Sequence, residues 1–186
     1  MPAVKAPHIP RVIYIQTIFD TESILKNYGK STDYNNPTGL PHPDPSGRTA
    51  MYMLTNWTSQ LSGQASGNLE IQAQVNDIIN WRTMSLSNNT GDAVLFYDFG
   101  VPANAVIEQP QLELSRPTVP IPVKPFSPPY NYSMEAVTDV YWYSIVRGVG
   151  SSAYTVRFFI LTQDPNTGNL VRYFYWWDPT VTVKQT

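Results

Sequence analysis

The chain has 186 residues, a formal net charge of -2 and no cysteine. This length corresponds to one domain, since domains have roughly 100–200 residues, and such a domain can fold without a disulfide or a metal. The missing cysteines exclude structural disulfides, cysteine-ligated zinc, iron–sulfur clusters and cysteine nucleophiles. A net charge close to zero also excludes the basic surface expected of a nucleic-acid-binding domain.

The composition favours strands over helices. The chain contains 17 prolines, and 13% of its residues are aromatic. Proline breaks helix interiors, whereas aromatic and β-branched residues suit the half-buried surface of a sheet. No apolar run approaches the roughly 18 residues of a membrane-spanning helix. Residues 1–10 lack the apolar stretch of a signal peptide. We therefore expect a soluble all-β protein that begins with a tail over residues 1–10.

The first predicted strand is residues 11–19 (RVIYIQTIF), an apolar and β-branched run. Thr21 or Ser23 is placed to cap a short helical turn over residues 24–28, because a hydroxyl there can accept a hydrogen bond from a free backbone amide. Residues 29–49 follow as a long loop, since their prolines exclude strand pairing over most of the segment.

Strand patterns resume at residues 50–55 and 69–75. The second of these (LEIQAQV) alternates apolar and polar residues, which is typical of a strand buried on one face. Residues 78–85 and 93–99 predict two further strands, because polar turn residues separate them.

The C-terminal part combines a proline-rich stretch with three further β-like runs. Residues 117–130 (PTVPIPVKPFSPPY) predict polyproline II structure within a long loop over residues 115–133. Residues 137–147, 153–162 and 170–177 have strand character. A polar segment that contains proline and glycine joins the last two, which therefore predict a β-hairpin.

The runs together predict an antiparallel β-sandwich of the jelly-roll or immunoglobulin-like type, with about seven to nine strands. Residues 11–186 form it as a single domain. The side chains expected in its core are Ile13, Ile15, Leu69, Ile71, Val75, Trp81, Leu95, Val156, Phe158 and Trp176.

Residues that carry most enzyme chemistry are scarce. The histidines are His8 and His42 alone, so the sequence indicates neither a histidine-ligated metal nor a Ser–His–Asp triad. Gly-x-Ser-x-Gly and Gly-x-Gly-x-x-Gly motifs are missing as well. We therefore predict a non-enzymatic protein, with calcium as the one metal that its oxygen ligands could hold.

Oxygen ligands gather where the first strand opens into the long loop. Carboxylate, amide and carbonyl oxygens are calcium ligands, so calcium is predicted at Asp20, Glu22 and Asn36. A competing structural interpretation is that Asp20 closes the strand end and that the asparagines populate the loop for conformational reasons. The residues predicted to form this ligand-binding mouth are Asp20, Glu22, Asn35, Asn36, Thr38 and His42.

Three segments carry a family resemblance. Residues 20–25 (DTESIL) and 36–39 (NPTG) form the first, residues 69–77 (LEIQAQVND) the second, and residues 173–181 (YFYWWDPTV) the third. In this order the chain resembles the bacterial inclusion body protein family (PixA/AidA-like) over residues 11–183. The family pattern has an acidic residue and then histidine after Pro-Thr-Gly, whereas Leu40 and Pro41 precede His42 here.

The resemblance implies a bacterial protein that is cytoplasmic or released by a non-classical route. It further implies links to quorum sensing and host association, and action by binding or self-assembly, with a homo-oligomer as an expected state. It implies no catalytic residues. The alternative is a calcium-dependent lectin that binds a glycan, with an exposed aromatic face of residues 173–177 stacked on the sugar ring. Core packing of those aromatic residues competes with that role.

Overall fold

The computed structural model describes residues 9–41, 49–125, 128 and 131–184. Within them the chain forms fifteen short or medium strands, one α-helix, α1 (Thr21–Asn27), and a single 3-10 turn, η1 (Trp57–Ser59). The predicted all-β class is confirmed. None of the described helices is long and apolar enough to cross a membrane.

A five-stranded sheet carries the first half of the fold. Its order is β3 (Met51–Leu54), β1 (Val12–Phe19), β6 (Ile78–Ser85), β11 (Asp139–Ile145) and β8 (Gln111–Ser115). Strands β1 and β6 run parallel over eight register pairs, so the prediction of a purely antiparallel structure is wrong. The long excursion between them returns the chain to the starting end of β1, as a parallel pair requires.

A four-stranded sheet forms the second layer. Its order is β2 (Thr38–Gly39), β14 (Leu170–Trp177), β13 (Thr155–Gln163) and β7 (Ala93–Gly100). The predicted hairpin of the two aromatic runs is confirmed, because β13 and β14 pair along their whole length. Strand β2 lies inside the predicted loop of residues 29–49 and pairs in parallel with β14.

Three two-stranded ribbons complete the fold. They are β4 (Gln60–Ser62) with β5 (Glu70–Ile71), β12 (Gly150–Ala153) with β15 (Thr180–Val183), and β9 (Thr118–Pro122) with β10 (Tyr132–Ala136). Polyproline II was predicted for the proline-rich stretch and is wrong for β9, which pairs with β10. An edge strand tolerates proline, because the nitrogen that lacks a hydrogen can point away from the partner strand.

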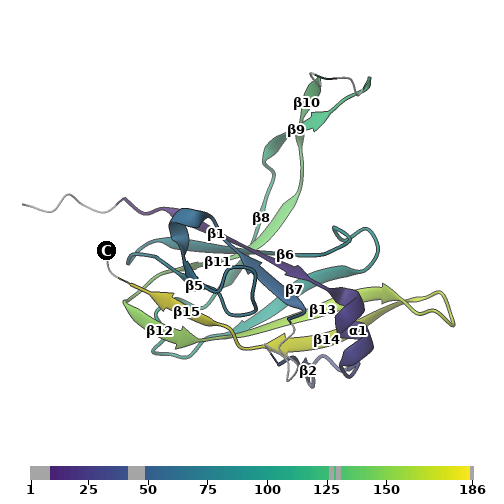
Figure 1. Ribbon diagram of the computed structural model, residues 1–186, viewed down its shortest axis with the longest axis horizontal. Coiled ribbons are helices and arrows are strands. Elements are labelled where there is room, and N and C mark those ends of the chain that lie inside the picture. Colours follow the sequence, from purple (N-terminus) through teal and green to yellow (C-terminus); the bar gives the residue numbers. More distant parts are fainter. Residues whose placement is uncertain (1–8, 42–48, 126–127, 129–130, 185–186) are drawn as a thin grey trace, which may run out of the picture.

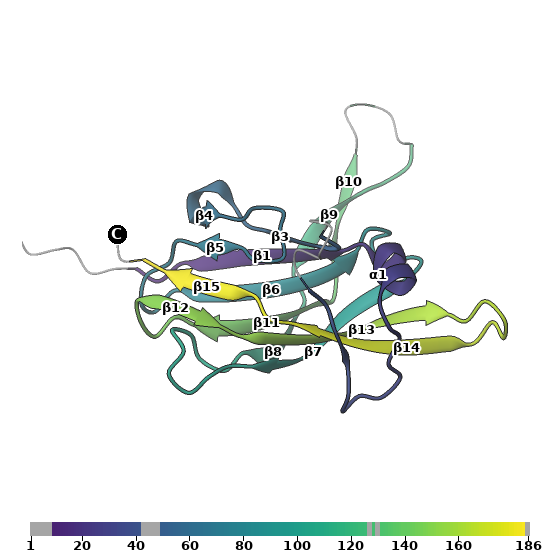
Figure 2. The same ribbon diagram turned by 60° about the horizontal axis from the view of Figure 1, so that its bottom comes forward.

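The two larger sheets lie face to face (Figure 2). Aromatic side chains from both sheets pack between them. Phe19 of the first sheet meets Phe96, Phe158 and Trp177 of the second, with ring centroids 4.5–6.0 Å apart. Ring pairs at such separations stabilise the core beyond the area that they bury.

Most of the predicted core is confirmed, and three of its members are wrong. Val75 and Leu95 are 39% and 42% exposed, and Trp176 is half-buried. Val75 lies beyond the end of β5, in a turn. Leu95 and Trp176 alternate with buried neighbours, so the opposite face of each strand lines the core. The members that are buried as predicted are Ile13, Ile15, Leu69, Ile71, Trp81, Val156 and Phe158.

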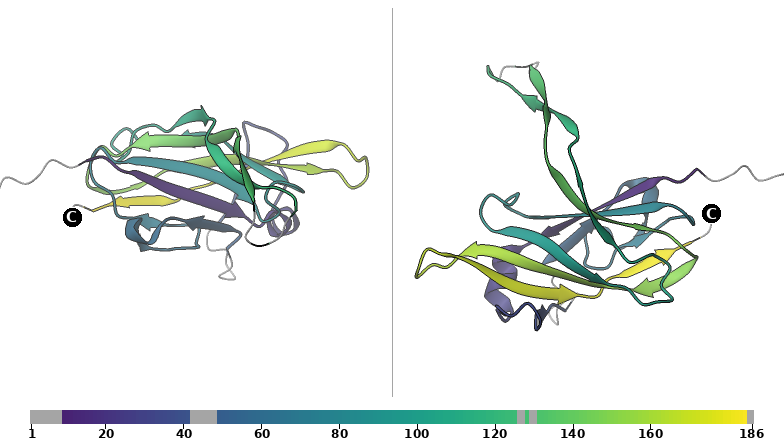
Figure 3. Two further views of the ribbon diagram at one scale, coloured as in Figure 1. Left: turned by 90° about the horizontal axis from the view of Figure 1, so that it is seen from above. Right: turned by 180° about the vertical axis from the view of Figure 1, so that it is seen from behind.

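A long arm projects from this body (Figures 1 and 3). Strands β8 and β11 leave the five-stranded sheet as its stem, and the β9–β10 ribbon continues the arm outward. We refer to residues 111–125 and 131–142 as the arm. It replaces much of the predicted loop over residues 115–133.

Candidate functional site: a pocket at the base of the arm

The predicted mouth contains a helix cap. Asp20 Oδ1 accepts a hydrogen bond from the Ser23 amide at 3.0 Å, and Glu22 lies in the first turn of α1. The helix therefore begins earlier than predicted, and Asp20 caps it in place of Thr21 or Ser23. A carboxylate suits this position because the first helical amides lack partners within the helix.

The loop residues of the mouth are held by local hydrogen bonds. Asn35 donates its amide to Asp33 Oδ1 at 2.9 Å, and the backbone oxygen of Asn36 accepts from Ser31 Oγ at 2.7 Å. Thr38 lies in β2, opposite Tyr175 of β14. His42 falls outside the described residues. Among those described, no group of three or more His, Cys, Asp or Glu side chains could hold a metal ion. Calcium binding through a mixed set of oxygens stays a prediction.

We expect Asp20→Ala to lower the free energy of unfolding by about 1 kcal/mol, because the Ser23 amide loses its partner. Thermal unfolding with and without calcium measures this, with Asn36→Ala added in a second variant. A melting temperature of the parent protein that rises with calcium, and no longer does so in the double variant, would support the metal site. A melting temperature that falls by about 2–4 °C in the Asp20→Ala variant, with or without calcium, would mean that Asp20 acts only as a helix cap.

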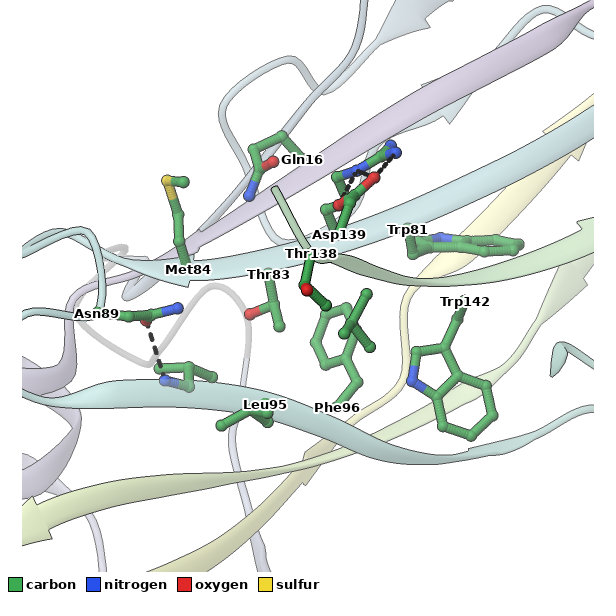
Figure 4. A pocket seen from close by; sticks show the side chains of 13 residues that line it. Gln16, Trp81, Thr83, Met84, Asn89, Leu95, Phe96, Thr138, Asp139 and Trp142 are labelled. Carbon is green, nitrogen blue, oxygen red and sulfur yellow. Dashed lines mark hydrogen bonds and ion pairs between the residues drawn. The ribbon is translucent and has the colours of Figure 1, made fainter. Parts of the chain in front are cut away.

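A pocket of about 380 Å³ lies where the arm leaves the body (Figure 4). Strand β11 pairs with β6 only as far as the Trp142–Trp81 register pair, and from there it turns into the arm. In the described part of the chain, the later residues of β6 pair with β1 and have no strand on their other side. Strand β7 is the edge of the opposite sheet, so the pocket opens between two strand edges.

Aromatic side chains form the inner wall of the pocket. Trp81 is almost fully buried and donates its indole Nε1 hydrogen to the Tyr154 hydroxyl at 3.2 Å. Trp142 packs on Phe99 of the core with ring centroids 5.1 Å apart, and Phe96 lines the same wall. The wall is continuous with the core, which fixes its shape.

An ion pair stands at the rim. The Arg82 guanidinium binds both carboxylate oxygens of Asp139, and the rings of Tyr14 and Tyr141 lie 5.1 and 4.9 Å from its central carbon. The hydrogen bond to Asp139 raises the pKa of Arg82 above its ordinary value. The two charges compensate each other, so the rim carries no net charge.

Two polar atoms of the pocket have no hydrogen-bond partner among the residues that the structure describes. They are Thr83 Oγ1 and Gln16 Nε2, and both are buried. Figure 4 shows Thr83 on the side of β6 that faces Phe96, and Gln16 beside the opposite face. A buried polar atom without a partner is uncommon in a folded protein and calls for an explanation.

The arrangement is suited to binding. Asp139 is the one carboxylate among the described lining residues, and Arg82 engages it. Sequence reasoning missed this pocket because its residues come from β1, β6, β7 and β11. One signal was present, since Thr83 is a polar residue at an inward position between Trp81 and Ser85.

Comparison with known proteins assigns the family. The chain matches the family described as PixA, inclusion body protein, over residues 11–183. The chain belongs to the PixA inclusion body protein family. The predicted resemblance is therefore confirmed over the same residues.

A crystal structure of a PixA inclusion body protein from Burkholderia cenocepacia J2315 has the same fold. It aligns with a TM-score of 0.69 at 20% sequence identity, and the alignment covers 97% of this chain and 100% of that one. None of the curated proteins matches the chain. At 20% identity, the likeness to the solved structure concerns the fold alone.

Proposed function

We propose that this member of the PixA inclusion body protein family is a non-catalytic protein that associates with further copies of itself through the arm. The observation that carries the proposal is a row of exposed apolar side chains along the arm. In a monomer these side chains face water, whereas a second copy would cover them.

The stem of the arm presents an apolar stripe. Leu112 lies opposite Trp142 in the ladder and Leu114 opposite Val140, so all four side chains share one face. Trp142 reaches the core on that face, yet Leu112 and Leu114 are each 57% exposed. The stripe thus extends the apolar interior outward to a place where no described strand of the second sheet covers it.

The outer ribbon repeats the pattern. Tyr132 and Met134 lie opposite Pro122 and Pro120, and the two non-proline residues are 65% and 56% exposed. A two-stranded ribbon is at best marginally stable alone in water. Burial of this face against another copy would supply the missing stabilisation.

The prolines of β9 also favour contact through side chains over strand addition. Pro120 and Pro122 carry no amide hydrogen, so β9 cannot form a regular ladder of hydrogen bonds with a further strand. The arm is therefore suited to face-to-face contact, which permits a defined assembly and hinders indefinite growth of the sheet.

We expect the double substitution Leu112→Thr and Leu114→Thr to weaken self-association about 30- to 150-fold. The exposed part of each leucine is worth about 1–1.5 kcal/mol when a partner covers it. Threonine keeps the strand preference of the site. Light scattering after size exclusion, over a range of protein concentrations, measures the change in mass.

The matched control replaces Leu86 and Leu170 by threonine, because they are 64% and 71% exposed and lie outside the arm. We expect the control to associate like the parent protein. The proposal fails if the parent protein stays monomeric at high concentration, or if both double variants lose the same amount of association.

The finer expectations stay predictions from the family resemblance. They are quorum-sensing control, host association, and a cytoplasmic or non-classically released location. The calcium-dependent lectin also stays a prediction. A glycan array with and without a chelator separates it from an assembly protein, since only a lectin of this kind gives chelator-sensitive binding to one class of sugar.

A further inference from the structure

We infer that the pocket between β6, β7 and β11 binds a small neutral molecule that is largely apolar and carries one carbonyl or hydroxyl group. In this arrangement the Thr83 hydroxyl, on the side of β6 that faces Phe96, is the contact that selects the polar group, because Gln16 lies beside the opposite face. The inference concerns a site inside one copy of the chain. Val140 and Trp142 line this site and also belong to the apolar stripe of the arm, whereas Leu112 and Leu114 do not line it.

The size of the pocket suits a compact organic molecule. Its volume of about 380 Å³ lies within the range of roughly 300–1,000 Å³ that is usual for ligand sites. The same space would hold about a dozen water molecules at ~30 Å³ each. Water against such a wall gains few hydrogen bonds, so an apolar ligand can displace it favourably.

The walls define the class of ligand. Trp81, Phe96 and Trp142 supply ring surfaces, and Val94 and Val140 add aliphatic surface. These side chains favour a flat aromatic molecule or a short hydrocarbon chain. At the rim, Arg82 and Asp139 neutralise each other, so neither an anion nor a cation gains from binding there.

Thr83 differs from the polar residue that follows it on the same face of β6. Ser85 is fully engaged, since its hydroxyl contacts Ser87 Oγ at 2.9 Å and accepts from the Asn89 amide at 2.9 Å. Thr83 Oγ1 is buried and has no hydrogen-bond partner in the described part of the chain. An unsatisfied hydroxyl destabilises the empty protein. What distinguishes Thr83 is that its unpaired hydroxyl also lines the pocket, where a bound molecule can become its partner.

Thr17 provides the matched control. It is the register partner of Thr83 on β1, it is fully buried, and its hydroxyl also lacks a partner. Thr17 does not line the pocket. Exchange of either threonine for valine keeps the shape and removes one unpaired hydroxyl, so only the Thr83 exchange should alter ligand choice.

The test uses neutral fluorescent N-phenylnaphthylamine as the probe, with acetonaphthone and isopropylnaphthalene as competitors of equal size. We expect saturable binding of the probe and displacement about threefold to tenfold better by the ketone, which is the usual gain from one hydrogen bond. Thr83→Val should bind the probe yet lose the preference for the ketone. Thr17→Val should keep both.

A blocking variant distinguishes probe binding in the pocket from probe binding on the apolar stripe of the arm. Thr83→Phe places a ring in the pocket and should abolish probe binding, whereas the Leu112→Thr, Leu114→Thr protein should bind the probe like the parent. Circular dichroism checks that each variant folds. If Thr83→Phe does not fold, the result for Thr83→Val decides the test. The inference is overturned if the parent shows no saturable binding, or if Thr83→Val keeps the ketone preference.

Discussion

Exchange of Asp77 for alanine is expected to lower the free energy of unfolding by about 3–5 kcal/mol and the melting temperature by about 10–15 °C. Asp77 is fully buried. Its carboxylate accepts hydrogen bonds from the backbone amide and the Nε of Arg11, at 3.0 and 3.2 Å, and from the Gln74 amide at 2.9 Å. Without the carboxylate these donors lose their partner, and the start of β1 loses its attachment. Urea unfolding of the parent and the variant measures the difference.

Asp164 is the control for this prediction. Its carboxylate also accepts two backbone hydrogen bonds, from Asn166 and Thr167, but in an exposed turn between β13 and β14. Water can replace the lost acceptor there, so Asp164→Ala should cost about 1 kcal/mol. Equal losses for the two variants would show that Asp77 does not organise the fold as described.

The alternation of apolar and polar residues predicted the strands that are buried on one face. The bounds of β6 and β14 agree with the predicted runs, and β1 and β7 differ from theirs by one residue. A period of two residues reports burial on one face, and that information is contained in the strand itself. The partner of each strand is not contained in it, so the parallel pairing of β1 with β6 could not be predicted.

The functional features depended on the non-local part of the fold. The pocket exists because β11 leaves β6 beyond Trp142, and no pattern within residues 137–147 indicates that departure. The arm was missed because its prolines favour polyproline II in isolation, whereas pairing with β10 selects the extended edge strand.

Two aspartates have structural roles that the sequence did not assign to them. Asp20 was placed at the end of a strand and also caps α1. Asp77 follows Asn76 in a pair that is typical of a turn, yet its side chain connects this turn to Arg11, which directly precedes β1. A turn aspartate and a buried anchoring aspartate look alike in sequence, because the difference lies in distant residues that fold over the side chain.

The second large effect is expected at Trp177. This side chain is fully buried and touches the rings of Phe19, Phe96 and Phe158, with centroids 5.5–5.7 Å apart. It therefore joins the two sheets. Trp177→Ala leaves a cavity that rigid strands cannot close, so we expect a loss of about 3–5 kcal/mol in urea unfolding.

Its neighbour Trp176 is the matched control, because the sequence alone placed Trp176 in the core. Trp176 lies on the opposite face of β14, half-buried against Gly39, where a side chain Cβ would come within 3.1 Å of the indole ring. Solvent already reaches this site and can fill the space that alanine leaves. Trp176→Ala should therefore cost about 1–2 kcal/mol, mainly from the lost apolar contact. A larger loss at Trp176 than at Trp177 would mean that the opposite face of β14 packs on the core.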